Sequence, residues 1–268
     1  MTNNNDASIG IFDSGFGGLT VMRAIRGALP HENIIYFGDT ARVPYGSKSP
    51  ETIFRYTLEN SAFLVDQGIK LLVIACHTAC SIAFNEIKRM SKVPIVGVLL
   101  PAVEEAVRQT KSGNLAILGT RATISSGVYQ DEISKRLPEA ELMSISCPLL
   151  VPLVEEGYIE HPVSELIIQE YLRPLRHKQI DTLLLACTHY PLLFNTIKKI
   201  LGEEVVLIDP AASCAECVKE LLTKKNLLNP QTDIPNYQFY VSDDPEKFRL
   251  LGKTFLNYPI EYIISKPV

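Results

Sequence analysis

Two stretches of sequence decide the fold, and they are two copies of one pattern. The first is Ile69-Lys70-Leu71-Leu72-Val73-Ile74-Ala75-Cys76-His77-Thr78, and the second is Ile180-Asp181-Thr182-Leu183-Leu184-Leu185-Ala186-Cys187-Thr188-His189. Each is an apolar run that ends in Ala-Cys and continues into a polar pair typical of a helix start. The copies agree again at Phe84-Asn85-Glu86-Ile87-Lys88 and Phe194-Asn195-Thr196-Ile197-Lys198. The pattern predicts two similar halves, each with one cysteine at a strand-to-helix junction.

The repeat extends beyond the cysteine stretches. Ser8 to Phe12 has the pattern of a short buried strand that ends at Asp13, and Asn114 to Gly119 is its counterpart in the second half. An offset of roughly 110 residues indicates a duplicated domain rather than a short solenoid repeat. We therefore predict an α/β fold of two pseudo-symmetric three-layer domains with mostly parallel central sheets. Residues 1–98 plus 210–268 are expected to form the first domain, and residues 99–209 an inserted second domain.

Strands and helices are expected to alternate along the rest of the chain. Ser49-Pro50-Glu51 has the residues of a helix start, with a serine cap, a proline in the first turn and an acid. Further strands are expected at 33–37, 93–98, 141–146, 205–209, 237–241 and 260–264. A helix is expected after the first cysteine strand up to about residue 91, and another is expected to begin at Pro101. Further helices are expected at 162–175, 211–224 and 243–253.

Composition limits the kinds of partner. The chain has 268 residues, of which 46% are hydrophobic and 21% charged, with a net charge of −4. Without a basic stripe, a nucleic-acid surface is not expected. Neither a signal peptide nor an apolar run long enough for a bilayer is evident. We therefore expect a cytoplasmic protein whose six cysteines are reduced, so that a cysteine is available as a thiolate.

Five candidate site residues follow predicted strands. Ligands of parallel α/β sheets bind outside the carboxyl ends of the strands. Asp13, Tyr45, Cys76, Thr120 and Cys187 all lie just past such ends. Their shared placement predicts a single active site in the cleft between the two domains.

Two facing thiols suit one kind of chemistry. A cysteine before a helix start lies near the positive end of the helix dipole, which stabilises an anion by about 0.3–1 kcal/mol, and a neighbouring histidine adds to this. A thiolate can remove a proton from one face of a carbon, and a thiol can return one to the other face. The developing enolate needs preorganised donors, for which the backbone amides after the strand ends are candidates. This inversion of a stereocentre requires no cofactor and no metal.

Four segments together resemble those of the bacterial glutamate racemases, which belong to the cofactor-independent aspartate/glutamate racemase superfamily. They are Ile11–Gly18, Pro44–Gly46, Ala75–Ala79 and Cys187–Leu193, and the similarity runs over nearly the whole chain. The resemblance implies interconversion of L- and D-glutamate, which supplies D-glutamate for peptidoglycan and so for the cell wall and cell shape. It implies a small-molecule substrate, with no nucleic-acid or membrane partner, and is compatible with a homodimer.

The resemblance also implies roles for individual residues. Cys187 would deprotonate L-glutamate, with support from His189. Cys76 would deprotonate D-glutamate, with support from Asp13. Glu155 corresponds to a further family carboxylate near the second thiol. The implied substrate contacts are Asp13, Ser14, Pro44, Tyr45, Gly46, His77, Thr78, Thr120, Thr188 and His189.

One position departs from the family pattern. The family usually has Asn where this chain has His77, and that Asn contacts the substrate. Histidine can also donate a hydrogen bond, but it is larger and can carry charge. We expect altered affinity or altered pH dependence rather than lost activity.

Several other residues have simpler interpretations. Cys147 and Cys80 are expected to be buried small hydrophobic residues. The isolated pair Cys214 and Cys217 lacks a second ligand pair at zinc spacing, so no metal site is expected. Asp39 is either a turn former or a carboxylate that supports the site.

Two other functions remain open at this point. The sequence separates a glutamate racemase only poorly from an aspartate racemase, or from another amino-acid racemase of the same superfamily, because the choice of substrate depends on pocket depth. A non-catalytic two-lobed protein that binds a small acid would not need both cysteines. Solvent deuterium at the α-carbon of glutamate distinguishes it from an enzyme.

Overall fold

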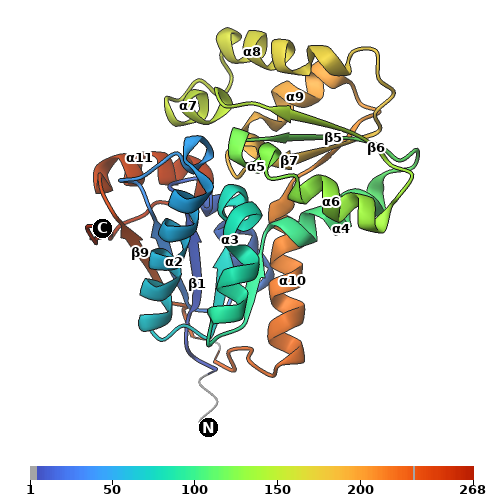
Figure 1. Cartoon of the computed structure of the whole chain (residues 1–268). Helices are drawn as coiled ribbons and strands as arrows, with labels where there is room; N and C mark the ends of the chain where they lie inside the picture. The colour runs from blue at the N-terminus through green and yellow to red at the C-terminus, as the bar shows by residue number, and fades with distance from the viewer. Residues whose placement is uncertain (1–4, 232) are drawn as a thin grey trace.

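Two parallel β-sheets organise the chain in this computed structural model, which describes residues 5–231 and 233–268 (Figure 1). The first sheet has the strand order β10-β9-β2-β1-β3-β4. Its strands are β1 (Ile9–Asp13), β2 (Ile34–Gly38), β3 (Leu71–Ile74), β4 (Ile95–Gly97), β9 (Tyr237–Val241) and β10 (Ile264–Ser265). The second sheet has the order β6-β5-β7-β8. Its strands are β5 (Asn114–Gly119), β6 (Glu141–Ser146), β7 (Thr182–Ala186) and β8 (Val206–Ile208).

The two sheets repeat one topology. The order β2-β1-β3-β4 in the first sheet matches the order β6-β5-β7-β8 in the second. In this match β1 corresponds to β5, β2 to β6, β3 to β7 and β4 to β8. The central strands β1, β3, β5 and β7 are almost wholly buried. Continuous apolar strands are what a parallel sheet covered on both faces requires. The predicted fold class is therefore confirmed, and each sheet with its helices is called a lobe below.

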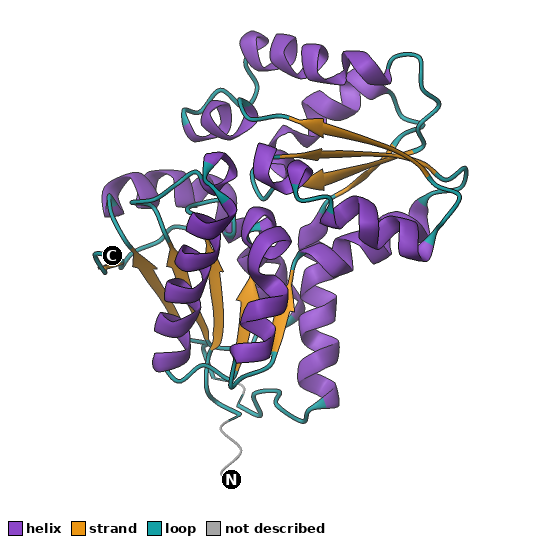
Figure 2. Ribbon diagram, in the orientation of Figure 1, coloured by secondary structure: helices purple, strands orange, loops and turns teal. Residues whose placement is uncertain are grey.

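Helices cover both faces of each sheet (Figure 2). In the first lobe α2 packs against α3, while α1 packs against α10 and α11. In the second lobe α6 packs against α4 and α5, while α8 packs against α7 and α9. The helices are α1 (Leu19–Ala28), α2 (Pro50–Asp66), α3 (His77–Met90), α4 (Leu99–Gln109), α5 (Arg121–Ser125), α6 (Val128–Arg136), α7 (Leu150–Glu155), α8 (Pro162–Leu172), α9 (Phe194–Leu201), α10 (Pro210–Lys224) and α11 (Pro245–Leu256).

Local sequence explains the start of α2 but not the end of the chain. Ser49 caps α2, since its side chain accepts a hydrogen bond from Thr52 N at 3.3 Å. The strand predicted at 260–264 is wrong over most of its length, because only Ile264 falls in β10. Ile260 instead buries its side chain beside Gly252 of α11, leaving 2% exposed. Its apolar character reflects packing under a helix rather than strand pairing.

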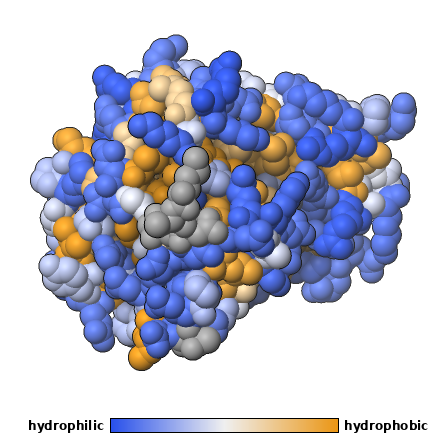
Figure 3. Space-filling model, turned by 90° about the horizontal axis from the view of Figure 1, so that it is seen from below, coloured by the Kyte–Doolittle hydropathy of each residue, from blue (hydrophilic) through white to orange (hydrophobic). Residues whose placement is uncertain are grey.

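The face seen from below in Figure 3 is mostly hydrophilic, with apolar groups scattered among the polar ones. Within the described residues, no helix is both long and apolar enough to cross a membrane.

A buried ion pair lies at the amino ends of the first sheet's strands. Lys70 Nζ lies 2.5 Å from Glu32 Oε2, and each side chain is only 3% exposed. Lys70 N donates to Ser8 O at 2.9 Å, while Glu32 Oε1 accepts from Asn229 N at 2.8 Å. The pair therefore joins the entry to β3 with the segment that leads into β9.

We expect Lys70→Met to lower the free energy of unfolding by about 3–5 kcal/mol, because it leaves the Glu32 carboxylate buried without its partner. The double variant Glu32→Leu/Lys70→Met should recover most of this loss. Urea denaturation measures both, with Lys178→Met, at an exposed lysine, as the matched control. A Lys70→Met variant no less stable than the control contradicts the expectation.

Candidate active site

One small cavity lies where strand ends of both lobes meet. Its walls come from the loops after β1, β2, β3, β5 and β7, together with α7. The lining residues are Ser14, Val43, Pro44, Tyr45, Gly46, Cys76, His77, Thr78, Thr120, Val151, Cys187, Thr188 and His189. Its volume of about 20 Å³ leaves room for roughly one water molecule. A groove between α4 and α10 has a larger volume than this cavity, about 710 Å³, but neither Cys76 nor Cys187 borders it.

The structure brings together most of the residues predicted for a site. Two of them, Asp13 and Glu155, are not on the cavity wall but contact residues that are. Asp13 Oδ1 accepts from Thr188 Oγ1 at 3.4 Å. Glu155 Oε1 lies 2.9 Å from His189 Nε2. Both carboxylates therefore act on the cavity through a neighbouring side chain.

Cys76 is held as a thiol. It occupies the position before the 14-residue helix α3 without a capping hydrogen bond from its side chain, and its Sγ donates to Ser14 Oγ at 3.6 Å. Burial raises the pKa of Cys76 above its ordinary value, because a thiolate there would be desolvated, and the charge of Asp13 raises it further. Burial likewise raises the pKa of the Asp13 carboxyl. This side of the cavity therefore favours a group that can give up a proton.

Cys187 has different surroundings. The prediction that a helix begins directly after it is wrong, because a 3-10 turn at Tyr190–Leu193 comes first and α9 starts only at Phe194. Pro191 accounts for this, since the residue before a proline is disfavoured in α-helical conformation. No helix start therefore lies directly after Cys187 to place a positive dipole end beside its sulfur. A positive charge comes instead from His189, whose Nδ1 lies 4.0 Å from Cys187 Sγ.

His189 is positively charged at neutral pH. Burial alone would lower the pKa of its imidazole, but the contacts with Cys187 and Glu155 outweigh it and raise the pKa to about 10. An imidazolium beside a sulfur stabilises the thiolate. Phe255 of α11 packs edge-on against the ring at 5.4 Å between centroids, which holds its orientation. This side of the cavity therefore favours a group that can accept a proton.

The glycine-rich turn after β1 lets the lobes approach closely. A Cβ added at Gly17 would lie 2.2 Å from Thr188 Oγ1 and 2.6 Å from His189 Nδ1. A Cβ added at Gly46 would lie 2.5 Å from Thr120 Cβ. Contacts this short are sterically forbidden, so no larger residue fits at either glycine without moving the lobes apart.

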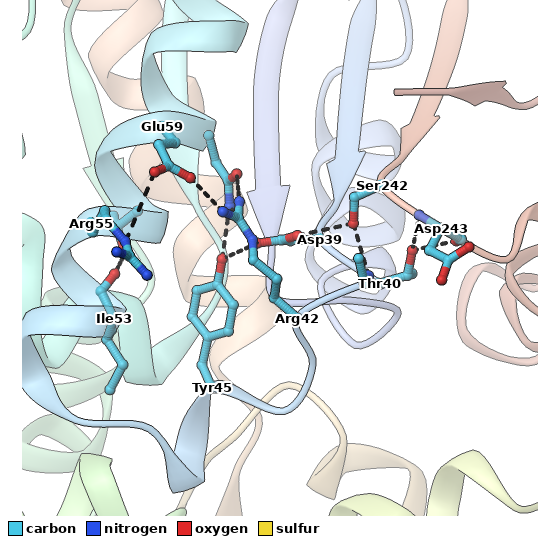
Figure 4. A network of polar contacts seen from close by, with 12 residues as sticks. Asp39, Thr40, Arg42, Tyr45, Ile53, Arg55, Glu59, Ser242 and Asp243 are labelled. Atoms are coloured by element: carbon cyan, nitrogen blue, oxygen red, sulfur yellow. Dashed lines mark hydrogen bonds and ion pairs between the residues drawn. The ribbon is translucent and has the colours of Figure 1, made fainter. Parts of the chain in front are cut away.

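A polar network holds the loop that carries Tyr45 (Figure 4). Its centre is the fully buried Asp39, which accepts from Tyr45 Oη, from Asn60 Nδ2 at 3.2 Å and from Ser242 Oγ at 2.9 Å. Arg42 Nε lies 2.7 Å from the same carboxylate. Of the two interpretations of Asp39, the geometry favours the supporting carboxylate. Asn60 and Ser242 escaped the sequence analysis because they come from the middle of α2 and from the loop after β9.

Three threonine hydroxyls meet across the lobes. Thr78 Oγ1 on α3 lies 2.9 Å from Thr120 Oγ1 and 3.1 Å from Thr123 Oγ1, and the latter two are 2.9 Å apart. The sequence analysis missed Thr123. Its spacing of three from Thr120 at a helix start was the available signal, since such residues share a helix face.

The remaining cysteines have structural environments. Burial raises the pKa of Cys80 and of Cys147 to about 12, and it also raises that of Cys214. Cys217 is half-buried. In the described part of the chain, no group of three His, Cys, Asp or Glu side chains is placed to hold a metal ion.

Two lobes of one topology present two cysteines to one cavity, Cys76 beside a carboxylate and Cys187 beside an imidazole. This arrangement defines a class, the two-base racemases. Comparison with known proteins agrees. The family model for Asp/Glu/hydantoin racemases matches residues 17–218, and the chain belongs to that family.

Its relatives at high identity are glutamate racemases. The chain is 48% identical over 249 residues to that of Geobacter metallireducens and 47% identical over 248 residues to that of Syntrophus aciditrophicus. These matches cover 93% and 92% of this chain, and 92% of each relative. The crystal structure of glutamate racemase from Francisella tularensis in complex with D-glutamate matches with a TM-score of 0.93 and 39% identity, over 98% of both chains.

The two thiols should differ in reactivity. We expect iodoacetamide to alkylate Cys187 faster than Cys76 at neutral pH, because only Cys187 lies beside an imidazolium. The Cys76 rate should rise with pH, because burial and the charge of Asp13 raise the pKa of that thiol. Mass spectrometry of the labelled peptides gives both rates.

His189→Asn should slow alkylation of Cys187 about tenfold or more and leave Cys76 unchanged, since one charge-assisted contact is lost. His161→Asn, at an exposed histidine outside the cavity, is the control. Faster labelling of Cys76 than of Cys187 in the unaltered protein would contradict this description of the site.

Proposed function

We propose that this protein interconverts L- and D-glutamate by two-base proton transfer at the α-carbon. The observation that carries the proposal is that Cys76 and Cys187, one from each lobe, border one cavity, with Asp13 near the first thiol and His189 beside the second. The names of its relatives supply the amino acid, because those at high identity are glutamate racemases.

The proton transfers follow from the two environments. With L-glutamate bound, the Cys187 thiolate removes the α-proton and becomes a thiol, while His189 keeps its proton and its ion pair with Glu155. The Cys76 thiol then gives its proton to the opposite face of the carbanion and becomes a thiolate. The product is D-glutamate. Starting from D-glutamate, the two cysteines exchange roles.

The carbanion needs donors for the charge that develops on its carboxylate. The first turn of α3 offers backbone N–H groups beside Cys76, and a helix N-terminus is a ready anion site. The hydroxyls of Thr78, Thr120 and Thr188 line the same cavity. These groups replace the stabilisation that a cofactor would supply, so the proposed reaction needs none.

The proposed roles of individual residues rest on these contacts. Cys76, Cys187, Asp13, His189 and Glu155 carry or support proton transfer. Ser14, Pro44, Tyr45, Gly46, His77, Thr78, Thr120, Thr188 and His189, which line the cavity, bind the substrate, and Asp13 does so through its hydrogen bond with Thr188.

Substrate entry requires the lobes to part, because a cavity of about 20 Å³ does not hold glutamate. We place the domain boundaries at 1–98 plus 210–268 and 99–209. The sheets support this division, since strands between residues 9 and 97 and between 237 and 265 form the first sheet and strands between 114 and 208 the second.

The proposed setting is the cytoplasm, where D-glutamate enters peptidoglycan and the reacting thiols stay reduced. A homodimer remains a prediction that the mass of the protein in solution decides.

Deuterium exchange tests the reaction directly. In D₂O we expect the protein to place deuterium at the α-carbon of L- and D-glutamate while it racemises both, followed by NMR and chiral chromatography. Cys76→Ala should abolish racemisation and exchange of D-glutamate but retain exchange of L-glutamate. Cys187→Ala should do the reverse. The lost rates should fall by about 10²–10⁴-fold, which is the usual contribution of a positioned acid or base.

The half-buried cysteine of α10 provides the matched control, since Cys217→Ala should change neither rate. Exchange of aspartate but not of glutamate would favour the aspartate racemase. Binding of glutamate with no exchange would favour the non-catalytic binding protein.

A further inference from the structure

His77 meets a tyrosine from the opposite lobe. His77 begins α3 and borders the cavity, while Tyr129 lies in the first turn of α6. His77 Nδ1 and Tyr129 Oη are hydrogen-bonded. The two rings lie nearly parallel, with 6.0 Å between centroids and 23° between planes. The side chains are closely packed, since His77 is 2% exposed and Tyr129 0%.

Burial decides which protons these side chains carry. It lowers the pKa of His77 to about 3, so the imidazole is neutral and has one N–H. It raises the pKa of Tyr129 well above its ordinary value, so the phenol keeps its hydrogen. The pair therefore holds two hydrogens, and only one of them can lie between Nδ1 and Oη.

The direction of the hydrogen bond follows from the lack of another acceptor. Among the described residues, His77 Nδ1 is the one hydrogen-bond partner of Tyr129 Oη. If Nδ1 carried the imidazole hydrogen, the phenol hydrogen would be buried without an acceptor, which costs about 1–3 kcal/mol. Tyr129 therefore donates to Nδ1, and the imidazole hydrogen is on Nε2.

The hydrogen on Nε2 needs an acceptor in turn. Within the described part of the chain Nε2 has no hydrogen-bond partner, yet it is not sealed among protein atoms. The ring borders the cavity, which is therefore where an acceptor can reach this nitrogen. The acceptor with the matching chemistry is a carboxylate oxygen of a bound amino acid.

We propose that Tyr129 is a positioning residue for racemisation: it fixes His77 in the tautomer that presents Nε2–H to a carboxylate of the substrate. The inference rests on the proposed function, because it takes the occupant of the cavity to be a dicarboxylic amino acid. It also gives the lobes a joint role, since His77 of one lobe is set for binding by a hydroxyl of the other.

The tautomer is tested on the resting protein without substrate. In a ¹⁵N–¹H correlation spectrum, His77 Nε2 should carry the hydrogen and Nδ1 should appear as an unprotonated acceptor. Tyr129→Phe keeps the ring and removes the hydroxyl, and it should turn this pattern into a mixture of both tautomers. Nδ1 protonated in the unaltered protein, or an unchanged pattern in Tyr129→Phe, overturns the proposal. Neither reading depends on activity, so a failure of the proposed function is recognised separately.

Kinetics test whether the tautomer serves binding. Tyr129→Phe should raise KM for glutamate by about 2- to 10-fold, the effect of one net hydrogen bond, with a smaller change in kcat. His77→Asn should alter KM but retain activity, because its amide carries its own donor. In that background Tyr129→Phe should add nothing to KM, which a purely packing role does not predict.

The matched control is Tyr190→Phe. Tyr190 is also 0% exposed, and its hydroxyl donates to Cys147 O at 2.8 Å away from the cavity wall. Its loss should lower stability without a change in KM. Two results contradict the positioning role. One is that Tyr129→Phe raises KM equally in the unaltered protein and in the His77→Asn variant. The other is that Tyr190→Phe raises KM as much as Tyr129→Phe does.

Discussion

Close contact between the two lobes at Gly17 and Gly46 is the constraint on which the rest of the structure depends. Two sulfurs can serve one carbon atom only if the strand ends that carry them come within the width of an amino acid. The absent side chains at these glycines leave the space that Thr188, His189 and Thr120 occupy. The parallel sheets then fix the direction of approach, because Cys76 follows β3 and Cys187 follows the equivalent strand β7.

The repeated topology does not produce two equal thiols. Cys76 comes directly before a long helix, but burial and the carboxylate of Asp13 keep its proton in place. Cys187 has only a 3-10 turn after it, yet the imidazolium of His189 lies beside it. A local charge at a buried site outweighs a helix end, which contributes only about 0.3–1 kcal/mol in ordinary cases. The two thiols therefore lie in unlike surroundings, Cys76 near a carboxylate and Cys187 beside an imidazole.

The sequence alone predicted the features that follow from hydrophobic periodicity and from the residues at strand ends. Apolar runs gave the strands, and residues just past them gave most of the cavity wall. The missed residues reach the site from elements whose sequence has no such signal: Asn60 lies within α2, Ser242 follows β9, and Tyr129 lies on the polar helix α6. The helix expected at Cys187 and the strand at 260–264 were wrong for two different reasons. Pro191 delays the start of the helix, and packing beside Gly252 takes Ile260 out of strand pairing.

The contacts that close the lobes are of a kind that a substrate can replace. Across the cavity they are mostly neutral hydroxyl bonds, such as those among Thr78, Thr120 and Thr123. The ion pair of Lys247 with Glu156 at 3.5 Å is solvent-exposed and so contributes at most about 1 kcal/mol. Each neutral bond is worth only about 0.5–1.5 kcal/mol net, and a carboxylate accepts more strongly than a hydroxyl. The carboxylates of a dicarboxylic amino acid are thus suited to accept hydrogen bonds from the hydroxyls that join the lobes here.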